Sequence, residues 1–226
     1  MQWLDALVQG VLLGGMFAQY ALGMALMFGV MRIVNISHGD LVILLALIGI
    51  SFATKYTVGP FVSLLMLVPL AAFIGWALQR AILNRVVGDD PLPSLIATFG
   101  LSIALQNLMQ QIWSADTRSM PGGGIEQASF QIGSLYIGVL PVIVLVVATL
   151  LTSGLDLLLR FTRFGRALRA SSADVEAAAM TGVNPKVIYA LATAIAVGIL
   201  GFAAVFQGLR STVARGASRP GARRCA

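Results

Sequence analysis

Long apolar segments alternate with short polar ones along this chain. Six apolar runs stand out, at roughly residues 4–30, 41–53, 61–78, 95–113, 135–159 and 187–208. A helix of about 20 residues crosses the hydrocarbon core of a bilayer. The second run is too short for that, so we expect its helix to begin within the polar stretch before it. The pattern predicts an all-α fold, a polytopic transmembrane helical bundle of about six spans.

Composition supports a membrane domain. Of 226 residues, 58% are hydrophobic and 11% are charged, against roughly 25% charged in soluble domains. The single cysteine, Cys225, excludes an internal disulfide framework and a cysteine-based metal site. The formal charge of +6 could indicate nucleic-acid binding, but the basic residues fall in juxtamembrane loops and in the tail. We therefore expect a lipid bilayer and no nucleic acid as partner.

The distribution of lysine and arginine orients the spans. Alternate loops at 31–40, 79–94 and 160–186 hold eight basic residues, whereas the opposite loops together with the N-terminus hold only Lys55 and Arg118. The positive-inside rule places the first set in the cytoplasm and the N-terminus outside. The loop at 114–134 is then external. Its Met-Pro-Gly-Gly-Gly segment predicts a turn or flexible lip, with a specific binding role as the alternative.

The third cytoplasmic loop has two notable features. It begins with the densest internal basic cluster, formed by Arg160, Arg163, Arg166 and Arg169. A short helix follows near residues 172–181 and contains the sequence E-A-A-A-M-T-G. Ten residues make a rod about 15 Å long, which is too short to span a bilayer.

Helix signals bracket this segment. Ser171-x-x-Asp174 reads as a cap-like start, and Gly182 followed by Asn184-Pro185 predicts the stop. The alanines Ala177, Ala178 and Ala179 would leave the helix thin enough to lie in a groove of another protein. The alternative is an ordinary interfacial helix between two spans.

A polar stretch precedes the second apolar run. It contains Asn35, Ser37, His38, Gly39 and Asp40, and His38 is the only histidine. Polar groups cannot face lipid unpaired, so this stretch must line a cavity, pack between helices or lie at the interface. One His and one Asp are too few ligands for a metal site. We weigh two functions equally: lining a solute path, or capping the span with Asp40 or Ser37 as acceptor.

These two regions carry a family resemblance. R-I-V-N-I-S-H-G-D-L resembles the R-x-x-N-x-x-H-G-D/E element of permeases that import branched-chain amino acids, a group that also includes urea and amide importers. The stretch from Gly165 to Asn184 is similar to their second signature, and the likeness covers roughly residues 4–214. The resemblance implies a multi-pass inner-membrane subunit that couples to an ATPase through Glu176, Ala177, Ala178 and Gly182. It implies a second homologous permease, two ATP-binding subunits and a periplasmic solute-binding protein as partners.

The chain lacks the means to hydrolyse ATP itself. It has no G-x-x-x-x-G-K-[ST] loop, and neither lysine lies in a Gly-rich loop. A single histidine and a near-terminal cysteine make no plausible catalytic arrangement. We therefore expect a transport subunit that is not an enzyme, binds no cofactor and relies on ATP used by partner subunits. One alternative is a secondary transporter or channel, a class that requires charged residues in the middle of its spans for ion coupling. Another is a non-transporting scaffold, which leaves the E-A-A-x-x-x-G sequence unexplained.

The C-terminal end departs from the resemblance. The last 17 residues contain five arginines, which the predicted topology would place outside the membrane. We interpret residues 1–214 as the transmembrane domain, truncated at its C-terminal end, and 215–226 as a disordered or out-of-frame tail. The alternative is a genuine basic tail on a chain of reversed orientation.

Overall fold

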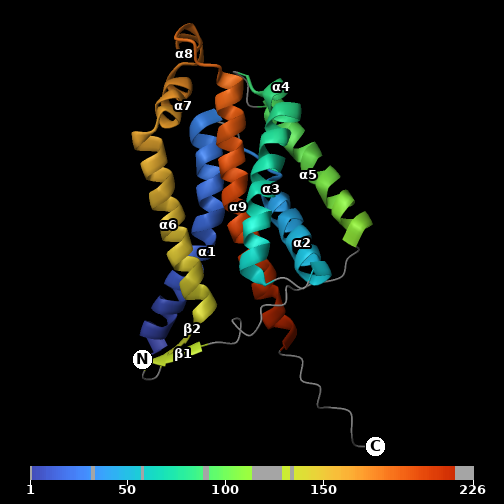
Figure 1. The fold of residues 1–226 in the computed structure, drawn as a ribbon, viewed down its shortest axis with the longest axis vertical. Coiled ribbons are helices and arrows are strands. Elements are labelled where there is room, and N and C mark those ends of the chain that lie inside the picture. Colours follow the sequence, from blue (N-terminus) through green and yellow to red (C-terminus); the bar gives the residue numbers. More distant parts are fainter. Residues whose placement is uncertain are drawn as a thin grey trace, which may run out of the picture.

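Six long helices form the framework of the protein (Figure 1). The computed structural model describes residues 2–31, 34–56, 59–88, 92–113, 129–132 and 135–216. All six helices are long and apolar enough to cross a membrane, which confirms the all-α bundle of about six spans and a multi-pass membrane protein. They are α1 (Gln2–Met31), α2 (His38–Tyr56), α3 (Pro60–Leu78), α5 (Leu92–Trp113), α6 (Val139–Phe161) and α9 (Pro185–Gly216).

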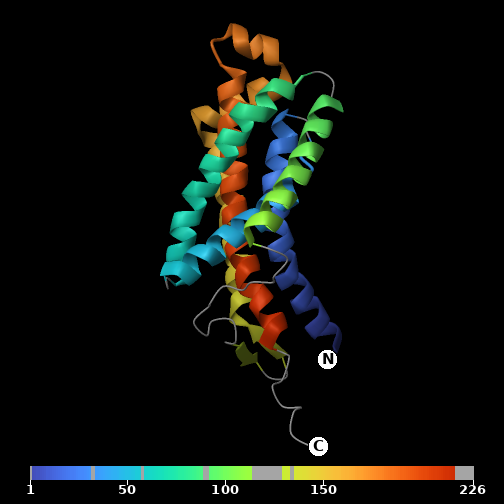
Figure 2. The ribbon, with the colours of Figure 1, turned by 90° about the vertical axis from the view of Figure 1, so that its right-hand side faces the viewer.

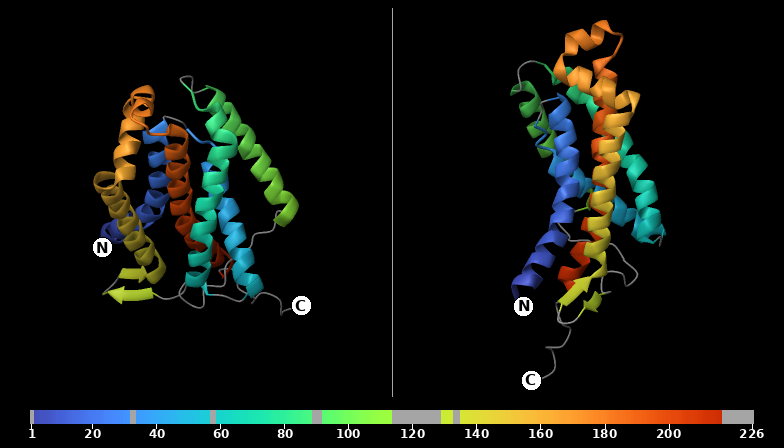
Figure 3. Two further views of the ribbon diagram at one scale, coloured as in Figure 1. Left: turned by 45° about the horizontal axis from the view of Figure 1, so that its top comes forward. Right: turned by 90° about the vertical axis from the view of Figure 1, so that its left-hand side faces the viewer.

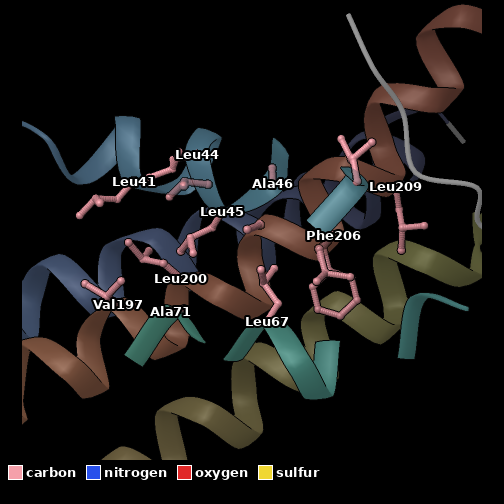
Figure 4. Packing of buried hydrophobic residues seen from close by; sticks show 14 of the residues in the cluster. Leu41, Leu44, Leu45, Ala46, Leu67, Ala71, Val197, Leu200, Phe206 and Leu209 are labelled. Carbon is pink, nitrogen blue, oxygen red and sulfur yellow. The ribbon is translucent and has the colours of Figure 1, made fainter. Parts of the chain in front are cut away.

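Helix α9 lies at the centre of the bundle, between α1 and α3 (Figures 1 and 2). Its inward face consists largely of small and branched residues that are fully buried, such as Ala196, Val197 and Leu200. Opposite them, a Cβ atom added to Gly75 of α3 would lie 2.7 Å from the Val197 Cβ. Small residues let two helix backbones approach closely, and Figure 4 shows Val197 and Leu200 packed beside Ala71.

The ends of the helices sort by charge as the sequence predicted. Helix α4 (Asn84–Val86), α7 (Arg163–Ala173) and α8 (Val175–Met180) lie at one end of the bundle, which also holds the C-terminal ends of α1 and α6 (Figure 1). The N-terminus and the far end of α9 lie at the other end. The end of α1 and the connections that contain α4, α7 and α8 therefore share one side, the predicted cytoplasmic side, while Arg32 of the first basic loop lies outside the described residues.

An antiparallel strand pair lies where the loop predicted to be external meets the predicted fifth apolar run, so the helix of that run begins at Val139 and not at residue 135. Strands β1 (Ser129–Ile132) and β2 (Leu135–Gly138) pair in the register Ser129↔Gly138 to Ile132↔Leu135, a local element that the apolar pattern did not predict. The Met-Pro-Gly-Gly-Gly segment of that loop lies outside the described residues, as do residues 217–226 of the predicted tail.

Helix α3 continues beyond its predicted end at residue 78. A π-helical turn, Gln79–Leu83, carries it directly into α4. The buried Gln79 amide donates to Asn84 Oδ1 at 3.0 Å and accepts a hydrogen bond from Thr193 Oγ1 of α9 at 2.7 Å. These polar contacts satisfy the buried amide and hold the wider turn against α9.

Candidate functional site

Two regions contain the residues that the sequence analysis singled out. The first is the turn from α6 into α7. Thr162 caps α7, its Oγ1 accepting from the Gly165 N–H at 3.1 Å. A Cβ atom added to Gly165 would lie 2.1 Å from the Leu159 backbone oxygen. Only glycine fits this close approach, so the sequence at this position fixes how sharply the chain turns onto the membrane surface.

The predicted basic cluster surrounds this turn. Arg160, Arg163, Arg166 and Arg169 are all exposed. Arg160 pairs with Asp156 at 2.7 Å, and Arg169 donates to the Leu159 carbonyl at the end of α6. The second contact places a cation at a helix C-terminus, where the backbone dipole favours it.

The short helix starts later than predicted. Asp174 is its N-cap, with Oδ1 accepting from the backbone N–H groups of Glu176 at 2.9 Å and Ala177 at 3.0 Å. Ser171 belongs to the preceding helix α7, so the predicted cap-like start at Ser171 is wrong. Asp174 breaks the predicted ten-residue rod into two helices, because its own backbone is extended. Helix α8 therefore has six residues and is about 9 Å long.

The predicted stop is confirmed. Gly182 has a φ of +85°, a conformation that L residues rarely adopt. The Gly182 N–H donates to Ala179 O at 3.0 Å, and the Val183 N–H donates to Ala178 O at 3.2 Å. This pair of bonds is a Schellman motif. Pro185 then begins α9 at the position where proline favours a helix start.

The exposed surface of α8 differs from the predicted one. Glu176 and Ala177 are exposed, whereas Ala178 is buried at 4% exposure and packs within the chain. The apolar residues at the two ends of the helix are exposed, Val175 at 46% and Met180 at 86%. The sequence analysis missed both, although apolar residues at the two ends of a short loop helix were a readable signal. Together they give α8 a small apolar face that this chain does not cover.

A cavity lies beneath α8. It has a volume of about 890 Å³ and is lined by residues of α8, α4, the start of α9 and the end of α1. Ser171 lines it, and the Ser171 Oγ is buried with no hydrogen-bond partner among the described residues. The space lies between part of α8 and the ends of the spanning helices.

The second region is the start of α2, which lies deep in the bundle. His38, the first residue of α2, has its Nε2 3.2 Å from the Tyr20 backbone oxygen of α1. Tyr20 lies eleven residues before the end of α1 at Met31, a distance of about 16 Å along a helix. The chain thus passes back along α1 before α2 begins, near the middle of the spanning region. Interrupted helices of this kind line solute paths in many transporters.

Asn35 organises this start. Its Oδ1 accepts from the Ser37 N–H at 3.1 Å and from the Ser37 Oγ at 2.7 Å. Asn35, Ser37 and His38 are all buried, whereas Gly39 is exposed. Asn35 precedes α2, whereas His38 is its first residue. Both hydrogen bonds to the Asn35 Oδ1 come from Ser37, the residue before α2, so Asn35 fixes the turn that precedes the helix. Capping of α2 by Asp40 or Ser37 stays a prediction.

Asp40 reaches across to α5. Its Oδ1 accepts from Gln106 Nε2 at 3.1 Å, and its Oδ2 accepts from Ser102 Oγ. Ser102 and Gln106 were missed by the sequence analysis, because no local pattern relates α5 to a residue 62 positions earlier. Figure 3 shows α5 at the edge of the bundle. The described residues contain no cluster of three His, Cys, Asp or Glu side chains that could hold a metal ion.

Comparison with known proteins gives consistent matches. The sequence profile of a family described as the permease component of branched-chain amino acid transport systems matches residues 6–220. The chain is 27% identical over 220 residues to the high-affinity branched-chain amino acid transport system permease protein BraD of Pseudomonas aeruginosa, covering 92% of this chain and 71% of BraD. It is 25% identical to the corresponding LivH proteins of Salmonella typhimurium and Escherichia coli K12, covering 91% of this chain and 70% of each. No solved structure matches the chain with significance.

Proposed function

This chain belongs to the family of branched-chain amino acid transport permease components, and we propose that it is the membrane-spanning subunit of an ATP-driven importer in the bacterial inner membrane. Its solute is a branched-chain amino acid or a related small polar molecule such as urea or an amide. The match over residues 6–220 carries this proposal. The six spanning helices and the basic loops on one side agree with it.

The partners follow from the same premise. Two ATP-binding subunits would supply the energy, a second homologous permease would complete the path, and a periplasmic binding protein would deliver the solute. ATP would bind and be hydrolysed on the partner subunits alone. This chain would transmit the resulting movement to its spans without performing any chemistry.

Helix α8 is the proposed contact with an ATPase subunit. It stands at the basic end of the bundle, beyond the spans (Figure 1). Glu176, Ala177 and Gly182 are exposed there, beside the uncovered apolar side chains of Val175 and Met180. The cavity beneath α8 gives the helix room to move when the ATPases close, so a push on its outer face can reach α9 through the turn at Gly182.

The start of α2 is the proposed part of the solute path. Asn35, Ser37 and His38 shape a buried break between α1 and α2, and Gly39 and Asp40 follow it on the more open side. The buried His38 Nδ1 has no hydrogen-bond partner among the described residues. Because an unpaired polar group is costly in lipid, this favours a water-lined route over contact with acyl chains.

The direct test is uptake by the assembled transporter. The full chain, its second permease, the two ATPases and the binding protein are reconstituted in proteoliposomes, and entry of labelled leucine is followed with and without ATP. We expect uptake that requires both ATP and the binding protein. Uptake driven by an ion gradient without ATP would favour a secondary transporter and contradict the proposal.

A crosslinking experiment tests the α8 contact separately. Cys225 is first replaced by alanine, and Met180→Cys is then introduced at the most exposed position of α8. We expect a thiol crosslinker to join this residue to an ATPase subunit. Phe61→Cys, also exposed but at the opposite end of the bundle, is the matched control and should give no crosslink. Equal crosslinking from both positions would reject the assignment.

A further inference from the structure

The Asp40 carboxylate lies at mid-depth in the spanning region. Asp40 is the third residue of α2, whose first residue contacts α1 about 16 Å from the end of that helix. Its partner Ser102 is the eleventh of the 22 residues of α5, which independently gives a central position. Ionisable side chains at such depth are costly, and they are usually retained where they serve a function.

The hydrogen-bond partners of Asp40 leave its charge uncompensated. Ser102 and Gln106 donate hydrogen bonds but carry no charge. Among the described residues, no lysine or arginine forms an ion pair with Asp40. The N-terminal end of α2 favours a carboxylate, but its partial charge does not replace a full counterion.

The second half of α5 has an exposed polar face, which begins at the Asp40 partner Gln106. Gln106, Asn107, Gln110 and Gln111 are all exposed on this spanning helix. In this second half of the helix, the side away from Gln106 and Gln110 exposes Leu108 at 45%, because positions two apart differ by about 200° around a helix. Nearer the start of α5, the side of Gln106 and Gln110 itself exposes the apolar residues Phe99 and Ile103. Side-chain amides do not face lipid without partners. The polar face therefore faces water or protein, and the side of Leu108 faces lipid.

We propose that Asp40, held by Ser102 and Gln106, binds the ammonium group of a zwitterionic solute within a water-filled path lined by the polar face of α5. This inference rests on the proposed transport function and names the chemistry of its solute site. An ammonium group has three donors and no acceptor, so it supplies both the missing charge and donors for the remaining lone pairs of Asp40. The amides farther along α5 offer the solute carboxylate donors as it moves.

The first experiment measures uptake by the reconstituted transporter. Asp40→Asn keeps the shape of the side chain and a hydrogen-bonding oxygen but removes the charge. We expect leucine uptake to fall by about tenfold or more, since a hydrogen bond to a charged group contributes at least this much, while ATP hydrolysis continues. Asp40→Glu should recover part of the uptake. The control Asp156→Asn removes an exposed carboxylate outside the path and should leave uptake unchanged.

The outcomes of this comparison are distinct. Wild-type uptake in Asp40→Asn would mean that the carboxylate is needed only as a hydrogen-bond acceptor, and would overturn the proposal. Equal loss in the Asn and Glu variants, together with loss of ATP hydrolysis, would indicate a structural role and also overturn it.

A second experiment does not depend on transport. In a chain with Cys225→Ala, Gln110→Cys is reacted with a cationic and an anionic methanethiosulfonate reagent from water, with Leu108→Cys as the lipid-facing control. We expect only the Gln110→Cys thiol to react, faster with the cationic reagent, and to lose that preference when Asp40→Asn is added. No reaction of the Gln110→Cys thiol from water would overturn the proposed path.

Protection experiments identify the ligand group. Leucine and isopentylamine, which carry the ammonium group, should slow the cationic reagent at this cysteine, whereas isocaproate, which lacks it, should not. Protection by sodium at the same concentration, or by isocaproate alone, would contradict ammonium binding. Failure of the parent transporter to take up leucine would count against the proposed function, while the thiol reactions would still decide on the charge and water access of this site.

Discussion

Replacing Gly182 by alanine should weaken the link between ATP hydrolysis and transport. The φ of +85° at this residue costs an L amino acid about 1–2 kcal/mol. A Cβ atom added there would meet nothing within 4 Å, so the cost is backbone strain without a steric clash. An energy of about 1.4 kcal/mol changes an equilibrium tenfold. We therefore expect the closed turn between α8 and α9 to become about fivefold to thirtyfold less populated in the alanine variant.

The assay is the number of solute molecules moved per ATP hydrolysed in proteoliposomes. Gly182→Ala should lower this ratio several-fold while the protein still inserts and ATP hydrolysis persists. Gly182→Asn is the matched comparison, because asparagine tolerates this backbone conformation and also ends helices in this way. It should retain most of the coupling. Gly182→Leu adds bulk at the same position and should uncouple at least as strongly as alanine.

A helix glycine elsewhere provides the control. A Cβ atom added to Gly154 of α6 would also meet nothing within 4 Å, but Gly154 lies in a regular helix. Gly154→Ala should therefore leave the coupling ratio unchanged. If Gly182→Ala couples normally, or if Gly182→Asn fails as badly as Gly182→Ala, then the geometry of the turn does not transmit the movement and the reasoning is refuted.

Three further substitutions test the local structure. Asp174→Ala removes the N-cap of α8 and should destabilise that helix by about 1 kcal/mol, which is measured as faster amide hydrogen exchange at Glu176 and Ala177. Asp174→Ser should restore the protection of these amides, and unchanged exchange in Asp174→Ala would argue against the cap. Gly75→Ala forces a methyl group against α9 and should lower the free energy of unfolding of the purified protein in detergent by about 1–3 kcal/mol. A variant as stable as the parent would show that α3 and α9 can move apart without cost. Asn35→Ala leaves the buried Ser37 N–H without its acceptor and should cost about 1–3 kcal/mol, whereas Asn35→Asp should cost less; equal losses would assign the effect to packing.

The sequence by itself determined the features that depend on local chemistry. Runs of apolar residues predicted the six spans, because a spanning helix must be apolar over its whole length. The loop charges predicted the shared side of three connections. Gly182 and Asn184-Pro185 predicted where α8 stops, since glycine accepts a positive φ and proline cannot continue a helix. The motif residues Asn35 to Asp40 marked a break at the start of the second span.

Only the tertiary structure decided what those residues contact. Asp40 bonds to Ser102 on α5, 62 residues away, and hydrophobic periodicity cannot predict a partner at that separation. The depth at which α2 starts is likewise marked by the contact of His38 Nε2 with the Tyr20 backbone oxygen of α1. An apolar run in the sequence does not predict this contact. Within α8, Ala178 is buried while Met180 is exposed. The apolar pattern did not predict this, because Asp174 splits the predicted rod into two helices and so changes which side of the short helix faces the chain. Local signals thus set where helices begin and end, and long-range packing set which polar groups meet inside the bundle.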